Sequence, residues 1–189
     1  MPRPLAVTAH EHAEMNHGGD IERIAEPPLR ELYLYWHGKR AGRAYPARAD
    51  IDPTEIKRLL PYVMLVDVLD DGRHFRFRLI GTDVAIGVDP TGKLQHEELP
   101  EGIYRDHITA LFRRGAAGPG ALYSRSSYGY TAIEGPRSVS RLFMPLSADG
   151  RTINMMLIGQ TADRQGRGGP STWLANPPTV TEELEIRLP

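Results

Sequence analysis

The clearest hydrophobic pattern in the chain runs from Tyr62 to Thr82, YVMLVDVLDDGRHFRFRLIGT. Its first half is apolar at both alternating sets of positions, which predicts a strand with two covered faces. Asp70-Asp71-Gly72 supplies turn chemistry, because glycine accepts a positive φ and aspartate tolerates one. The second half alternates strictly, with apolar side chains on one face and polar side chains on the other: Phe75, Phe77 and Leu79 against His74, Arg76 and Arg78. The segment therefore predicts an antiparallel hairpin.

Two amphipathic helices flank this hairpin in the sequence. The first runs from Leu29 to about His37, and its apolar residues fall at i, i+3, i+4 and i+7. These residues are Leu29, Leu32, Tyr33 and Trp36. The second helix runs from Gly102 to Gly115 and places Tyr104, His107 and Leu111 on one face, at spacings of three and four.

Three further strands are predicted near 121–127, 137–147 and 154–161. Helices and strands do not alternate, which excludes a doubly wound α/β fold. The order favours an α+β domain over 29–161, with one five-stranded antiparallel sheet, helices on one face and an N-terminal flanking helix. Residues 1–28 and 162–189 are rich in polar residues, Gly and Pro, and are predicted to be tails.

Composition narrows the function classes. The formal net charge of −1 over 189 residues gives no basic field for nucleic acid. The absence of cysteine excludes disulfides, thiolate zinc sites, iron–sulfur clusters and cysteinyl adducts. No secretory signal and no apolar run of about 18–20 residues is present, so a soluble cytoplasmic protein without membrane contact is expected. No phosphate loop, nucleophile elbow or HExxH motif indicates an enzyme.

Several ordered segments carry a resemblance to a known family. They are the Trp36 helix, PARADIDP at 46–53, LLP at 59–61, FRFRLIGT at 75–82 and PLS at 145–147. Together they resemble PAS domain family five, a small PAS-like family found in alphaproteobacteria, and the resemblance covers about 29–161. It implies a PAS-like fold with a hydrophobic cavity between sheet and helices, and a sensing role. It names no ligand or cofactor.

The central helix and the later strands hold the candidate ligand-binding residues. They are Phe77, Tyr104, His107, Leu111, Tyr128 and Arg141. His107 on an apolar face is most simply a neutral core histidine, while the alternatives are a polar handle for a ligand and a haem ligand. Tyr128 lies in a Gly- and Tyr-rich connection suited to covering a small molecule. The cofactor stays undefined.

The candidate interface residues lie on the first helix and the second hairpin strand. An exposed stripe of Leu29, Leu32, Tyr33 and Trp36 would promote aggregation, so it must be buried on the sheet or on a second subunit. The PAS resemblance favours a homodimer through this stripe. Arg76 and Arg78 form either a solvated basic face or a contact face for the N-terminal helix or a second subunit, where the guanidinium fork can meet carboxylates.

These observations favour a non-catalytic sensory or small-ligand-binding module. Its ligand would be apolar or amphipathic, and its signal would pass to a separate signalling protein. The alternative is a protein-interaction or dimerisation scaffold whose cavity is filled by its own side chains.

Overall fold

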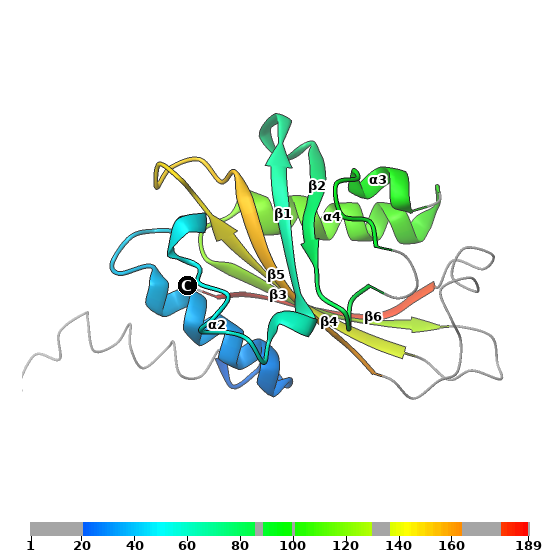
Figure 1. Ribbon diagram of the computed structural model, residues 1–189. Coiled ribbons are helices and arrows are strands. Elements are labelled where there is room, and N and C mark those ends of the chain that lie inside the picture. Colours follow the sequence, from blue (N-terminus) through cyan, green and yellow to red (C-terminus); the bar gives the residue numbers. More distant parts are fainter. Residues whose placement is uncertain (1–20, 86–88, 100, 130–136, 164–178, 189) are drawn as a thin grey trace, which may run out of the picture.

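The computed structural model describes residues 21–85, 89–99, 101–129, 137–163 and 179–188 (Figure 1). Its helices are α2 (Pro27–Lys39), α3 (Gln95–Glu98) and α4 (Ile103–Ala117), with short 3-10 turns η1 (Arg48–Asp50), η2 (Leu60–Tyr62) and η3 (Asp70–Gly72). Its strands are β1 (Val63–Leu69), β2 (His74–Ile80), β3 (Ala121–Gly129), β4 (Arg137–Leu146), β5 (Met155–Ala162) and β6 (Thr179–Leu188). Among these residues, no helix combines the length and apolarity needed to cross a membrane.

The strands form one antiparallel sheet in the order β2-β1-β5-β4-β3-β6. The predicted hairpin is confirmed, and Asp70, Asp71 and Gly72 all adopt positive φ in its turn. β1 also pairs with β5, as expected for a hairpin beside the last strand of the predicted domain. The α+β class and the five predicted strands are thus confirmed.

The sheet contains a sixth strand that the sequence pattern did not predict. β6 pairs with β3 from Ala121–Leu188 to Gly129–Thr179, with a register shift near Ser127. The segment 162–189 was predicted to be a tail, yet 179–188 lies in the sheet. β6 is the edge strand of the sheet, and its pairing with β3 satisfies the backbone groups on that side.

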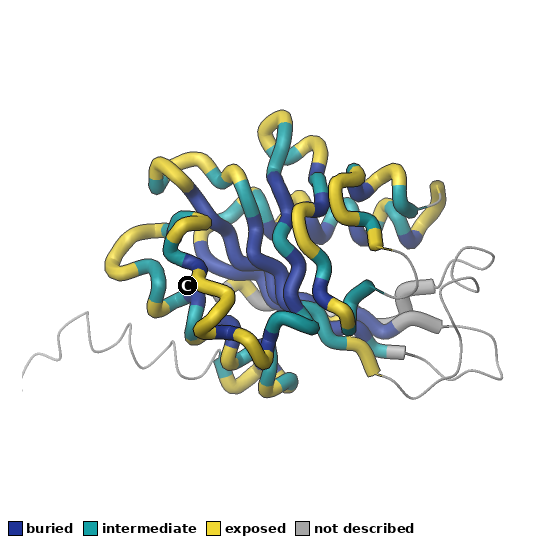
Figure 2. Tube along the Cα trace, viewed as in Figure 1, coloured by how far each residue is buried: buried dark blue, intermediate teal, exposed yellow. Residues whose placement is uncertain are grey.

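Helices cover both faces of the sheet. One face, the α4 face, packs against α4 through a buried cluster that includes Phe75, Phe112 and Phe143. The opposite face, the α2 face, packs against α2 through Leu29, Leu142 and Leu157. Figure 2 shows the central strands buried between these two layers. The strands are therefore apolar on both sides, as the pattern of β1 predicted.

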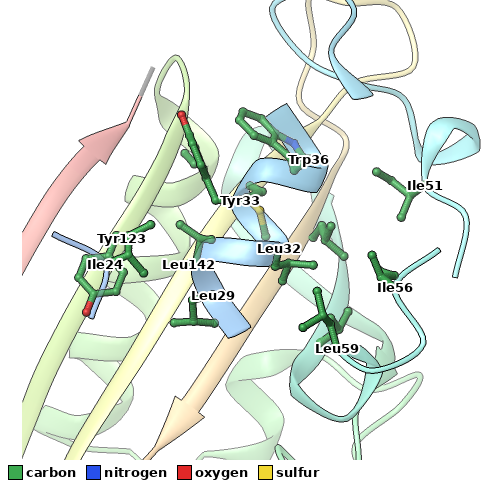
Figure 3. Packing of buried hydrophobic residues seen from close by; sticks show 14 of the residues in the cluster. Ile24, Leu29, Leu32, Tyr33, Trp36, Ile51, Ile56, Leu59, Tyr123 and Leu142 are labelled. Atoms are coloured by element: carbon green, nitrogen blue, oxygen red, sulfur yellow. The ribbon is translucent and has the colours of Figure 1, made fainter. Parts of the chain in front are cut away.

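α2 is docked on the sheet of its own chain (Figure 3). Leu29, Leu32, Tyr33 and Trp36 are all buried there. Gly159 of β5 makes room for this contact, since a Cβ at that position would lie 2.7 Å from Leu29 Cδ2. The prediction that the stripe forms a dimer interface therefore needs correction: these four side chains are covered by their own sheet and are inaccessible to a second subunit.

The packed domain also begins earlier than the predicted boundary at residue 29. Ile24 is fully buried in the α2-face cluster. Glu26, at the start of α2, accepts hydrogen bonds from the hydroxyls of Tyr123 (2.9 Å) and Ser140 (2.7 Å). Burial raises the pKa of Tyr123, and its bond to the Glu26 carboxylate adds to the shift. These bonds fix the N-terminus of α2 to β3 and β4.

Candidate functional site

Three polar side chains lie next to one another on the α4 face, across three strands. Ser124 of β3 pairs with Arg141 of β4, and Arg141 pairs with Gln160 of β5. Directly paired residues point to the same side of a sheet and bring their Cβ atoms to within about 5.5 Å. We call Ser124, Arg141 and Gln160 the polar row.

The polar row is buried although it carries a full charge. Arg141 is only 4% exposed, and its Nε donates a hydrogen bond to Gln160 Oε1 at 2.8 Å. Ser124 is 1% exposed, and its Oγ has no hydrogen-bond partner among the described residues. A buried hydroxyl without a partner costs about 1–3 kcal/mol of folding free energy. Such a group is expected where a water molecule or ligand atom completes the site.

α4 adds a second pair of polar groups beside the row. His107 Nε2 lies 3.2 Å from the hydroxyl of Ser126, and the ring tautomer decides which atom donates. Ser126 is two residues beyond Ser124 on β3, so both side chains face α4. Tyr104 precedes His107 by one helical turn and is buried. The site thus combines a guanidinium, an imidazole and two serine hydroxyls.

An apolar row borders the polar row along the strands. Leu122 pairs with Phe143, Phe143 pairs with Ile158, and all three are buried. Beyond them the interior is filled by aromatic rings. Phe112 of α4 contacts Phe75 and Phe143 edge-on, with ring centroids 5.3 Å and 5.5 Å apart. The interior of the α4 face is therefore polar at one end and closely packed with apolar groups at the other.

The structure describes the side chains of five of the six predicted ligand-binding residues, and they fall into two groups. Tyr104, His107 and Arg141 lie on the α4 face, with His107 and Arg141 in or beside the polar row. Phe77 and Leu111 belong to the apolar cluster, where Phe77 contacts Phe112 edge-on at 6.3 Å. Tyr128 ends the pairing of β3 with β4, and its side chain lies outside the described ones.

Sequence reasoning missed Ser124, Ser126 and Gln160. The alternation of Ser124 and Ser126 within a predicted strand indicates that both face one side. Which side that is, and which residues stand opposite, depends on strand pairing. The register of β3 with β4 and of β4 with β5 brings these residues to Arg141.

Arg76 and Arg78 point to the other side of the sheet, where both bind one carboxylate. Asp67 Oδ2 accepts a hydrogen bond from Arg76 Nε at 3.0 Å and from Arg78 Nε at 2.7 Å. Asp67 is 5% exposed, whereas the two arginine side chains are about half exposed. Neither alternative drawn from the sequence included this pairing: the arginines neutralise a buried carboxylate of the neighbouring strand.

A comparison with protein families identifies part of the chain. Residues 24–93 match the model of the PAS domain. The match includes α2, β1, β2 and the connection that follows β2, while the polar row lies beyond it. Comparisons with curated proteins and with solved structures gave no match. The five strands in the order β2-β1-β5-β4-β3 are consistent with a PAS-like fold, and a PAS domain indicates a sensory or interaction module.

Proposed function

We propose that this protein is a non-catalytic sensory module that binds a small amphipathic molecule between α4 and the sheet, and that its signal passes to a separate partner. The observation that carries the proposal is the unpartnered Ser124 hydroxyl beside the buried Arg141 guanidinium. A protein core rarely leaves a buried hydroxyl such as that of Ser124 unsatisfied unless a water molecule or a ligand binds it. The match of residues 24–93 to the PAS domain supports a sensory role.

The amphipathic character of the ligand follows from the two rows. A ligand placed at the polar row meets hydrogen-bonding groups there and apolar side chains at Leu122, Phe143 and Ile158. Most small-molecule sites have this composition, with an apolar lining and a few polar groups that set orientation. A ligand with a polar atom next to Ser124 would also give the unsatisfied hydroxyl a hydrogen-bond partner.

Native mass spectrometry of the freshly purified full chain tests the proposal, together with a thermal-shift screen of a broad metabolite library. The expected result is a retained small molecule, or a library compound that raises the melting temperature in proportion to the logarithm of its concentration above Kd. A chain that carries no adduct and responds to no compound would refute ligand binding.

The interaction scaffold is the second candidate, and one observation favours it. The apolar end of the α4 face is filled by the chain's own rings, with Phe112 packed against Phe75, Phe77 and Phe143. A self-filled interior needs no ligand for stability. The two candidates differ in the screen: a scaffold shows no compound-dependent shift, and changes at the polar row leave partner binding intact.

A homodimer remains part of the proposal, but not through the apolar stripe of α2. A dimer would use exposed surface, such as the outer side of α2 around Leu34, which is 59% exposed. Arg76 and Arg78 also keep part of their guanidinium surface exposed while they bind Asp67. Sedimentation of the full chain at micromolar concentration determines the assembly state: a dimer supports this part of the proposal, and a monomer refutes it.

A further inference from the structure

We infer that the β1–β2 hairpin carries, on the α2 face, a docking surface for an acidic and apolar segment of a partner protein. The inference rests on the part of the proposed function in which a separate partner receives the signal, and it specifies the chemistry of that partner. It uses three features: the guanidinium pair of Arg76 and Arg78, the exposed Leu79 beside it, and the position of α2 elsewhere on the same face.

α2 covers only part of the face on which it lies. It packs over β4 and β5, and the β1–β2 hairpin extends beyond it (Figure 1). The side chains that β2 presents on this face stay accessible among the described residues. The exposed fraction is 40% for Arg76, 56% for Arg78 and 43% for Leu79. A partner can therefore reach this part of the sheet without displacing a described helix.

A bulge in β2 brings Leu79 to the α2 face. The β1–β2 register shifts between the pair Val66–Phe77 and the pair Leu65–Leu79, which makes Arg78 the extra residue. Phe77 belongs to the core of the α4 face, whereas Leu65, opposite Leu79, packs against the α2-face cluster. Bulges commonly re-aim a side chain in this way. Uninterrupted alternation would put Leu79 in the core with Phe77, but the bulge puts it on the surface beside a guanidinium.

The register arranges this surface in two neighbouring rows. One row is charged: Asp67 of β1 pairs with Arg76, and its Oδ2 also accepts a hydrogen bond from Arg78 Nε at 2.7 Å. The other row is apolar and runs from Leu79 to Leu65. The rows lie two residues apart along β1, or roughly 7 Å. We call these five residues the hairpin patch.

The hairpin patch carries more positive than negative charge, because two guanidiniums share one carboxylate. Each guanidinium has five N–H donors and the carboxylate of Asp67 has two oxygens, so donors remain for a second acceptor. The bonds to Asp67 also hold both guanidiniums in place, which lowers the entropy cost of binding. A partner carboxylate balances the remaining charge, whereas a phosphate monoester would bring about two negative charges close to Asp67.

The partner must lie on the face of β2, because the middle of its outer edge is occupied. The backbone N–H of Phe77 donates to the carbonyl oxygen of Lys93 at 3.1 Å, and the Phe77 carbonyl accepts from the N–H of Gly92 at 2.7 Å. A bridge between Arg76 and Leu94 continues this contact. Recognition therefore depends on side chains. A carboxylate and an apolar side chain two residues apart in an extended segment reach both rows.

Binding of the full chain to an array of synthetic peptides tests this inference. The peptides place leucine and glutamate at varied spacings among glycine and serine, and each has a counterpart with glutamine in place of glutamate. The tightest binder is titrated in solution by fluorescence anisotropy at about 50 mM salt, where charge pairs are little screened. We expect leucine–glutamate peptides to bind, and the glutamine counterpart to bind about fivefold or more weakly.

Three results of this titration would overturn the inference. The first is an array in which no leucine–glutamate peptide binds. The second is equal affinity for the glutamate peptide and its glutamine counterpart, since recognition would then not depend on charge. The third is tighter binding of a counterpart with phosphoserine in place of glutamate, which would assign the surface to a phosphate instead of a carboxylate.

Two variants assign binding to the hairpin patch. Leu79→Gln removes the exposed apolar contact and should weaken the peptide several-fold. Arg78→Lys keeps the charge beside Asp67 but loses the planar fork, and should weaken the peptide about threefold. Leu34→Gln and Arg58→Lys change the same residue types at exposed positions elsewhere and should bind like the wild type. Equal effects of Leu79→Gln and Leu34→Gln would place binding elsewhere and contradict the inference.

The outcome is separable from that of the ligand-binding proposal. The metabolite screen reports on the interior of the α4 face, whereas the peptide titration reports on the opposite face. A positive screen with no peptide binding refutes the docking surface and leaves ligand sensing intact. Peptide binding without a response to any compound supports the docking surface and favours the scaffold. A dimer of the full chain that dissociates in the Leu79→Gln variant would assign the hairpin patch to a second copy and overturn the inference.

Discussion

The indole Nε1 of Trp36 donates a hydrogen bond to the carbonyl oxygen of Pro145 at 2.9 Å, entirely inside the protein. Trp36 lies on α2 and Pro145 on β4, 109 residues later in the chain. The bond gives the buried indole a partner and fixes the position of α2 over the sheet. α2 is therefore a structural layer of the domain.

We expect Trp36→Phe to lower the free energy of unfolding by about 2–3 kcal/mol, because it removes a buried hydrogen bond and part of the packed volume. Urea denaturation at unchanged m-value measures the loss. Leu34→Ala on the exposed side of α2 is the control and should stay within about 0.5 kcal/mol. Equal effects of the two changes would show that α2 is not docked as described.

Removing residues 1–42 is expected to unfold the domain rather than produce a folded monomer. The deletion would expose the α2 face, including Leu142, Met144 and Leu157. Exposed apolar patches of that kind lead to aggregation. Circular dichroism and sedimentation of the shortened chain check this result. A shortened chain that is monomeric, soluble and native in its spectrum would restore the original interface hypothesis for the stripe.

Gly115→Ala should destabilise the protein although alanine is the better helix former. A Cβ at residue 115 would lie 2.7 Å from Phe143 Cβ, which moves only with the backbone, and 2.8 Å from Phe143 Cγ, which moves only if the buried ring changes its χ1 rotamer. The overlap is expected to cost about 1–3 kcal/mol of the free energy of unfolding. Gly38→Ala in α2 meets nothing within 4 Å and should instead stabilise by about 0.5–1 kcal/mol. Thermal or urea denaturation that gave both changes the same sign would contradict the close approach of α4 to β4.

The sequence predicted a helix or strand well where the apolar residues of one buried face repeat at the period of that element. β2 and α2 both formed as expected, and Phe75 and Phe77 face the core. Leu79 was predicted to share that face but is 43% exposed, because a register shift in the β1–β2 pairing falls between Phe77 and Leu79.

The burial of α2 could not be predicted, because an apolar stripe does not say which surface covers it. The polar row was not predicted from the sequence for a similar reason. Its three residues become neighbours only through the strand register: Ser124, Arg141 and Gln160. β6 was missed although Leu184, Ile186 and Leu188 alternate with charged residues, because the Gly- and Pro-rich segment before them favoured a tail.

The arrangement of Asp67 between Arg76 and Arg78 predicts strong non-additivity. Arg76→Ala alone and Arg78→Ala alone should each lower the free energy of unfolding by no more than about 1 kcal/mol, since the remaining arginine still neutralises Asp67. The double variant leaves a buried carboxylate without either partner and should cost about 3–5 kcal/mol. A double-mutant cycle by urea denaturation measures the coupling energy.

An exposed ion pair provides the matched control for this cycle. Arg58 bonds to Glu31 at 2.9 Å, and its side chain is 85% exposed. Arg58→Ala should change the free energy of unfolding by less than about 0.5 kcal/mol. Additive effects of Arg76→Ala and Arg78→Ala would show that the two arginines do not share one buried carboxylate.

The most direct test of ligand binding at the polar row is nuclear magnetic resonance of the arginine Nε–H groups. The full chain is titrated with the library compound that gives the largest thermal shift, and Arg141→Lys assigns the Arg141 signal. We predict that this signal moves together with the backbone amides of Ser124 and Gln160, while that of the exposed Arg125 stays in place. Shifts confined to Arg125, Arg76 and Arg78, with Arg141 unchanged, would contradict the account.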